Sequence, residues 1–168
     1  MARANRIRPL EARRAMRALR ANPDDDTTLA FASGVVPTKQ FIELARPHLE
    51  GRPLQMEWHR VYQTAQERAG AGDDLVDDYR ALLDAEPDNA DLRYLLARVT
   101  PDVDAAERLM RAAAQSDPPS VYGIHSLAYQ HITEARFEEG LTLARRAREL
   151  EPDIASFTYS YYLDRVVF

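Results

Sequence analysis

Apolar residues recur along the chain at the three- and four-residue spacing of amphipathic helices, in segments that end near regularly placed prolines. In the segment 121–154 the apolar and small positions are Ile124, Leu127, Ala128, Phe137, Gly140, Ala144 and Ala147. A version shorter by three residues occupies 90–118, and looser versions precede it over 57–87 and 26–53. No segment shows the alternation that is typical of strands. The pattern therefore predicts an all-α protein built from pairs of helices.

Prolines mark the period of this pattern. They are Pro23, Pro53, Pro87, Pro118 and Pro152. The intervals between successive prolines of this set are 30, 34, 31 and 34 residues. Proline lacks an N–H and disfavours helical geometry in the preceding residue, so each one predicts the end of a helix. Repetition at this period is typical of a helical repeat array, whereas a generic helical bundle has no reason to repeat proline at a fixed spacing.

Capping residues predict where the helices begin. Short polar side chains that satisfy the free N–H groups of a first turn occur at 24–26, 73–74, 88–89 and 120. Pro47 falls inside the second helix of the 26–53 segment, which should therefore kink or end early. Residues 8–21 and 154–167 each predict a single helix at one end, which gives ten helices in all.

The segment 121–154 resembles the tetratricopeptide repeat (TPR), in which two antiparallel helices meet at small residues. On this resemblance Ala128, Gly140 and Ala147 are small because two helix backbones approach closely there. The resemblance is clearest over 88–120 and 121–154, and the helices of 1–53 are irregular. It implies one domain, 1–168, folded as a right-handed α-solenoid of about four hairpins with a lone helix at each end.

The resemblance also implies a binding site. In TPR proteins the first helices of the pairs line a concave groove, and the matching positions here are Arg60, Tyr94, Arg98, Tyr122, His125 and Tyr129. Tyrosine and arginine are enriched among binding hot spots, and arginine can hold a carboxylate with two parallel hydrogen bonds. The implied function is a non-catalytic scaffold that binds a protein or peptide. Lysines and asparagines of the clamp that binds acidic chaperone tails in some TPR domains are absent at these positions.

A structural interpretation of the same residues stays open. Tyr94 and Tyr129 could pack between adjacent helices instead of facing a ligand. Arg98 could pair with Asp91 on its own helix.

The segment 154–168 is apolar nearly all round, although the terminal helix of a repeat array normally keeps a polar face. One interpretation is a homodimer, or another self-assembly, through Phe157, Tyr161, Tyr162 and Phe168. The alternative is that more protein follows. The chain would then be the helical-repeat targeting or regulatory region of a larger enzyme or transcriptional regulator.

Composition argues against several classes of function. The chain is 45% apolar and 29% charged, which is typical of a folded protein, and it has no cysteine for disulfides or thiol chemistry. Its four histidines match no metal-ligand spacing, and no phosphate loop or nucleophile–base motif is present. We therefore expect no catalysis, no cofactor and no bound metal.

The remaining expectations concern location and partners. The sequence has no apolar run of about 18 residues and no apolar leader, so we expect a cytoplasmic protein without a membrane partner. Seven arginines lie within residues 1–23. They could contact nucleic acid, but a solvated face on a terminal helix is the simpler interpretation. The basic residues include a single lysine, Lys39, which indicates a GC-rich, bacterial genome.

Overall fold

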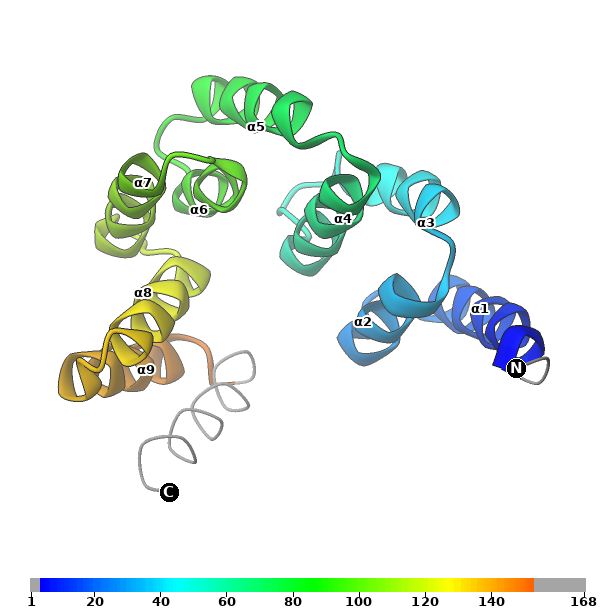
Figure 1. Cartoon of the computed structure of the whole chain (residues 1–168). Coiled ribbons are helices and arrows are strands. Elements are labelled where there is room, and N and C mark those ends of the chain that lie inside the picture. Colours follow the sequence, from blue (N-terminus) through cyan, green and yellow to red (C-terminus); the bar gives the residue numbers. More distant parts are fainter. Residues whose placement is uncertain (1–3, 153–168) are drawn as a thin grey trace. The chain divides into compact units, whose positions relative to one another are not determined.

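The structure is a computed structural model that describes residues 4–152, with only the backbone described at 4–8 and 73. Within that range the regular elements are all helical (Figure 1), and the prediction of an all-α protein is confirmed. They are α1 (Ala4–Ala21), α2 (Asp26–Val35), α3 (Thr38–Ala45), the short 3₁₀ helix η1 (Arg46–His48), α4 (Met56–Ala69), α5 (Gly72–Ala85), α6 (Ala90–Val99), α7 (Val103–Gln115), α8 (Val121–Thr133) and α9 (Phe137–Leu150). The lone helix predicted at 154–167 lies outside the described residues.

The helices group into two compact units that divide within α5. Unit 1, Met1–Leu75, contains α1 to α4 and the first turn of α5. Unit 2, Val76–Phe168, contains the rest of α5 and α6 to α9. That the whole chain forms a single domain stays a prediction.

Most of the predicted caps begin helices as expected. Side-chain oxygens of Asp25, Asn89 and Ser120 accept hydrogen bonds from first-turn N–H groups of α2, α6 and α8. Asp102 does the same for α7, which the sequence analysis did not predict. The early end predicted at Pro47 is also confirmed, because α3 stops at Ala45 and Pro47 lies in η1.

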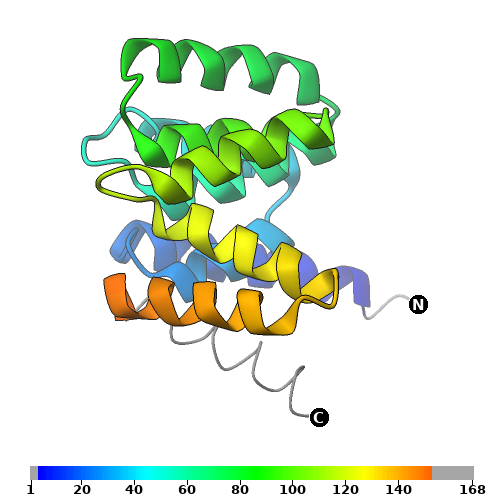
Figure 2. The same ribbon diagram turned by 90° about the vertical axis from the view of Figure 1, so that its left-hand side faces the viewer.

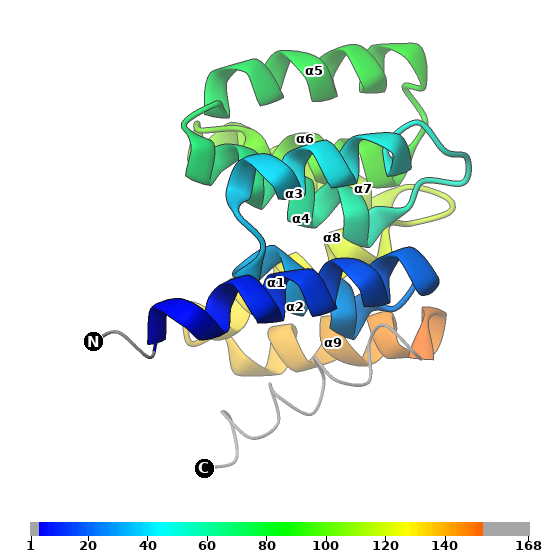
Figure 3. The same cartoon turned by 90° about the vertical axis from the view of Figure 1, so that its right-hand side faces the viewer.

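Unit 1 packs around the chain's single tryptophan, Trp58 on α4, which is 3% exposed. Its ring stacks on Phe41 of α3 and on His48 of η1, with centroids 6.4 and 3.9 Å apart. Its Nε1 donates a hydrogen bond of 3.0 Å to the carbonyl oxygen of Pro23. The helix α2 packs on both α1 and α4, and α3 packs on α4 (Figure 3). Trp58 therefore connects α4 to two separate segments of the chain, the turn at Pro23 and the continuous stretch of α3 and η1.

Unit 2 contains two helical hairpins that share contacts through α8. The helix α6 packs on α7, and α8 packs on α9 (Figure 2). In addition, α8 packs on α7 and on α6, so it touches α6, α7 and α9. Both candidate sites of unit 2 that are described below include residues of α8.

Small residues allow α8 to approach its neighbours. A Cβ atom added to Gly140 of α9 would lie 2.5 Å from Ile132 Cγ1 and 3.0 Å from the backbone oxygen of Ala128. A Cβ on Gly123 of α8 would lie 3.1 Å from the Cβ of Ala113 on α7. The prediction that Gly140 and Ala128 are small because two helices meet is thus confirmed.

Replacing Gly140→Ala should destabilise unit 2. The new methyl group overlaps a buried isoleucine and a backbone oxygen, so overpacking of about 1–3 kcal/mol outweighs the better helix propensity of alanine, roughly 0.5–1 kcal/mol. The matched control is Gly34→Ala on α2, where an added Cβ has no neighbour within 4 Å. We expect the control to be neutral or slightly stabilising. Urea unfolding followed by circular dichroism measures both, and equal stabilities would contradict the close-contact account.

Candidate functional site

The six residues of the predicted groove fall in both units. Arg60 lies on α4 in unit 1. The other five lie in unit 2 on the neighbouring helices α6 and α8, and we call them the α6–α8 face: Tyr94, Arg98, Tyr122, His125 and Tyr129. Residues three and four apart share one side of a helix, so the spacing places each set on a single side.

Two contacts join the beginnings of α6 and α8. The rings of Tyr94 and Tyr122 stack with centroids 5.6 Å apart and planes 29° apart. Beside them Ser120 Oγ donates a hydrogen bond of 2.6 Å to a carboxylate oxygen of Asp91. Tyr94 is only 2% exposed, so it packs between adjacent helices as the structural interpretation proposed. Its role is to support Tyr122, and little of its ring can touch a ligand.

The accessible part of the α6–α8 face centres on Tyr129. That side chain is 49% exposed, while His125 on the preceding turn is buried. Arg98 and Tyr122 are half-buried and present part of their surface. The face therefore offers one half-exposed aromatic ring on α8, together with a partly exposed second ring on α8 and a partly exposed guanidinium on α6.

Arg60 in unit 1 has acidic neighbours. It forms an ion pair with Glu57 one turn earlier on α4. Burial raises the pKa of the Asp26 carboxyl on α2, and the nearby Glu57 charge raises it further, while Arg60 lowers it. A carboxylate ligand would have to compete with both side chains for the Arg60 guanidinium.

Buried polar residues of α4 lie on the inner side of unit 1. His59 is 1% exposed and Gln63 is fully buried. Burial lowers the pKa of His59 to about 4, and the positive charge of Arg52 contributes to the shift. The imidazole is therefore neutral at physiological pH, which agrees with a structural role for this histidine.

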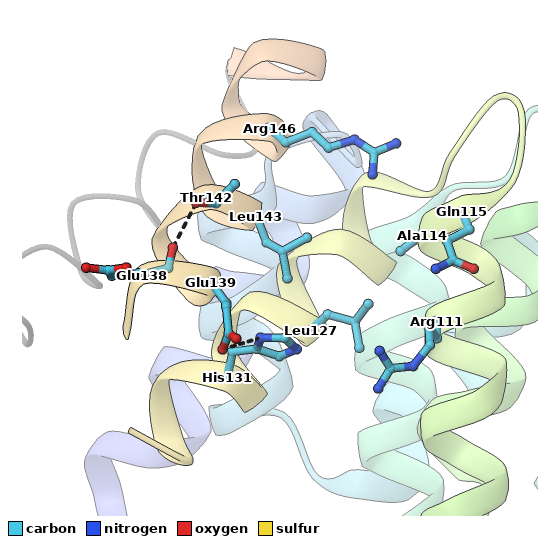
Figure 4. Close-up of a pocket in the computed structure, with 10 residues that line it drawn as sticks. All are labelled: Arg111, Ala114, Gln115, Leu127, His131, Glu138, Glu139, Thr142, Leu143 and Arg146. Carbon is cyan, nitrogen blue, oxygen red and sulfur yellow. Dashed lines mark hydrogen bonds and ion pairs between the residues drawn. The ribbon is translucent and has the colours of Figure 1, made fainter. Parts of the chain in front are cut away.

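A cleft between α7 and α9, with α8 as its floor, was not predicted from the sequence (Figure 4). It has a volume of about 470 Å³. We call it the α7–α9 cleft. The residues that line it are Arg111, Ala114, Gln115, Leu127, His131, Glu138, Glu139, Thr142, Leu143 and Arg146. Leu127 and His131 point away from the side of α8 that carries Tyr129, since they are offset by about half a helical turn. The α7–α9 cleft and the α6–α8 face thus use opposite sides of α8.

Charged side chains around the cleft are mostly paired. His131 Nδ1 lies 3.7 Å from a carboxylate oxygen of Glu139, which is also 3.8 Å from Arg136 Nε. Arg111 forms an ion pair with Glu107. Hydrogen bonds from Arg111 and Gln130 lower the pKa of the Glu107 carboxyl.

Arg146 is different from these neighbours. Among the described residues it has neither an ion pair nor a hydrogen bond, and Figure 4 shows its side chain extending from α9 toward the α7 wall. Sequence reasoning missed the cleft because it considered only the first helix of each pair. Arg146 is also one of three arginines in the stretch 145–148, and no sequence signal distinguishes it.

Other predicted features fall outside these two sites. The self-association residues Phe157, Tyr161, Tyr162 and Phe168 lie outside the described residues. Across 4–152, no group of three or more His, Asp or Glu side chains is arranged to hold a metal ion. None of the helices in this range has the length and apolar character needed to cross a membrane.

Comparison with known proteins assigns no family. No protein-family model matches the chain, and no curated protein matches its sequence. The TPR assignment therefore remains a proposal supported by the sequence pattern and the helix packing.

The stability of unit 1 should fall in mild acid because of His59. Its folded-state pKa of about 4 lies below the ordinary value of 6.5, so the unfolded chain takes up a proton first as the pH falls. The stability that unit 1 gains from the neutral form of His59 is complete above about pH 7 and is lost as the pH falls from about 6.5 to 4. Between pH 7 and pH 5 the free energy of unfolding should fall by roughly 2 kcal/mol. Urea unfolding followed by Trp58 fluorescence reports on unit 1.

The control is His59→Gln, which removes the titrating group and keeps a polar side chain. Its unfolding free energy should be lower at pH 7 but should change much less between pH 7 and 5. If both proteins lose the same free energy over this interval, another group controls the acid sensitivity of unit 1.

Proposed function

We propose that the chain is a helical-repeat module of the TPR type that binds a protein or peptide through the α6–α8 face and catalyses no reaction. The observation that carries this proposal is the half-exposed ring of Tyr129, which lies on the same side of α8 as Tyr122, the residue that stacks on Tyr94 of α6. Exposed tyrosines that are backed by packed neighbours are typical of binding surfaces.

Helix packing within each unit supports a repeat arrangement. In unit 2 the first helices of two successive hairpins, α6 and α8, touch each other as well as their partner helices. In unit 1 α2 also touches α4, but α2 packs mainly on α1 and α3 packs mainly on α4, so α2 and α4 are the second helices of their pairs there. Contacts between alternate helices are what stacked hairpins make in an α-solenoid, and in unit 2 they support a shared surface formed by the first helices α6 and α8. A right-handed solenoid is the arrangement we propose on this basis.

The chemistry of the face favours a particular kind of partner. Tyr129 offers a flat ring that loses little conformational entropy on binding, and Arg98 offers a guanidinium that can bind a carboxylate. Tyr122 is held in place by the buried Tyr94. We therefore propose a partner segment that carries an aromatic or apolar side chain and an acidic group.

A pull-down from native lysate tests the proposal. The baits are the wild-type chain, an Arg98→Ala/Tyr129→Ala variant and a matched control, Phe137→Ala/Arg145→Ala. The control removes an exposed aromatic ring and an exposed arginine from α9 without touching the α6–α8 face. Tyr94 is left intact, because removing a buried ring would test folding rather than binding.

We expect a protein that the wild type and the control recover but the Arg98/Tyr129 variant does not. Its affinity, measured with the purified protein, should fall about tenfold or more, since truncating one hot-spot side chain typically costs more than about 1 kcal/mol. Circular dichroism must show equal helicity for all three baits. Equal recovery by all three would assign Tyr129 and Arg98 to packing and would reject the face as a binding site.

A further inference from the structure

The α7–α9 cleft combines an apolar floor with charged walls. Its floor consists of Ala114 on α7, Leu127 on α8 and Leu143 on α9, and Leu143 is only half-buried. Ala114 and Leu127 belong to a buried cluster that Leu143 packs against. The floor is therefore rigid, and an apolar side chain placed on it would shield Leu143 further from water.

Two arginines and two glutamates line the cleft, and they differ in whether they are already paired. Glu139 faces His131 and Arg136, and Figure 4 shows the Glu138 carboxylate pointing away from the cleft. Arg111 on the α7 wall already pairs with Glu107. Arg146 on the α9 wall is left with no acidic partner among the described residues. A guanidinium beside an apolar floor is complementary to a ligand that carries a carboxylate next to an apolar group.

The dimensions of the cleft favour a peptide as that ligand. A volume of about 470 Å³ lies within the usual range of binding sites, about 300–1,000 Å³, and suits a few side chains. Residues of three helices line the cleft, so a bound segment could contact α7, α8 and α9 together (Figure 4). Gln115 on the α7 wall adds an amide that can hydrogen-bond a peptide backbone.

We propose that the α7–α9 cleft is a second docking site, which binds an acidic peptide segment of a partner protein. One or two apolar side chains of the segment lie on Leu127 and Leu143, and a neighbouring Asp or Glu carboxylate pairs with Arg146. This site is separate from the α6–α8 face, because the two lie on opposite sides of α8.

The test begins with a phage library of random dodecapeptides selected on the full-length chain. Recovered peptides are synthesised, and their affinities are measured by fluorescence polarisation against the wild type, Arg146→Glu and Arg145→Glu. The two variants make the same change of net charge at adjacent positions of α9. Arg145 is exposed and does not line the cleft, so it controls for long-range electrostatics and for effects on the helix.

We expect selected peptides with an Asp or Glu close to a large apolar residue. Their affinity should fall tenfold or more with Arg146→Glu and less than threefold with Arg145→Glu. Changing the acidic residue of the peptide to Lys should abolish binding to the wild type and restore binding to Arg146→Glu. Such a charge exchange identifies the pair directly, independently of any change in stability.

Other outcomes overturn the proposal. A selection that yields no binders, or binders without acidic residues, rejects an acidic peptide as the ligand. Binders that Arg146→Glu retains but Arg98→Ala/Tyr129→Ala loses would belong to the α6–α8 face, and they would support the function proposed above while rejecting this second site. Enrichment of sequences that match this chain's own segments would point to self-association instead.

Discussion

The close approach of α8 to its neighbours is the constraint on which unit 2 depends. At Gly140 and at Gly123 there is no room for a single added carbon without a shift of neighbouring atoms. Because the backbones lie so close there, α8 contacts α7, α9 and α6 at once and has little freedom to move relative to them. Both candidate sites include side chains of α8, and these side chains are therefore held in fixed positions. Tyr129 projects from one side of α8, and Leu127 forms the floor of the cleft on the other.

The helix ends that depend only on local backbone geometry could be predicted from the sequence. Pro47 ends α3 early because a proline cannot continue the hydrogen bonding of a helix, whatever surrounds it. Asn89 and Ser120 cap α6 and α8 because their short side chains reach the first-turn N–H groups of their own helices. The close helix contact at Gly140 could also be predicted, but only from the pattern of a whole helix pair and not from the local sequence.

The properties of the candidate sites depend on neighbours that are distant in sequence, and these could not be predicted. Tyr94 and Tyr129 were both predicted to line the groove, yet Tyr94 stacks on Tyr122 and is buried, whereas Tyr129 is half-exposed. Arg60 is next to Asp26, which the sequence analysis had treated only as part of a helix start. Arg145 and Arg146 are adjacent and chemically identical, and only the rotation of α9 decides which of them lines the cleft.

The two units differ in what their polar groups are used for. In unit 1 the groups around α4 are engaged within the fold, since Trp58 donates to Pro23, Glu57 pairs with Arg60, and His59 is buried in its neutral form. In unit 2 the Tyr129 ring is half-exposed on one side of α8, and on the other side the Arg146 guanidinium has no ion pair or hydrogen bond among the described residues. A side chain that already satisfies an internal partner must break that contact before it can bind a ligand, and this cost reduces affinity. By this argument the Arg146 guanidinium is better placed to bind a carboxylate than Arg60, which is already paired with Glu57.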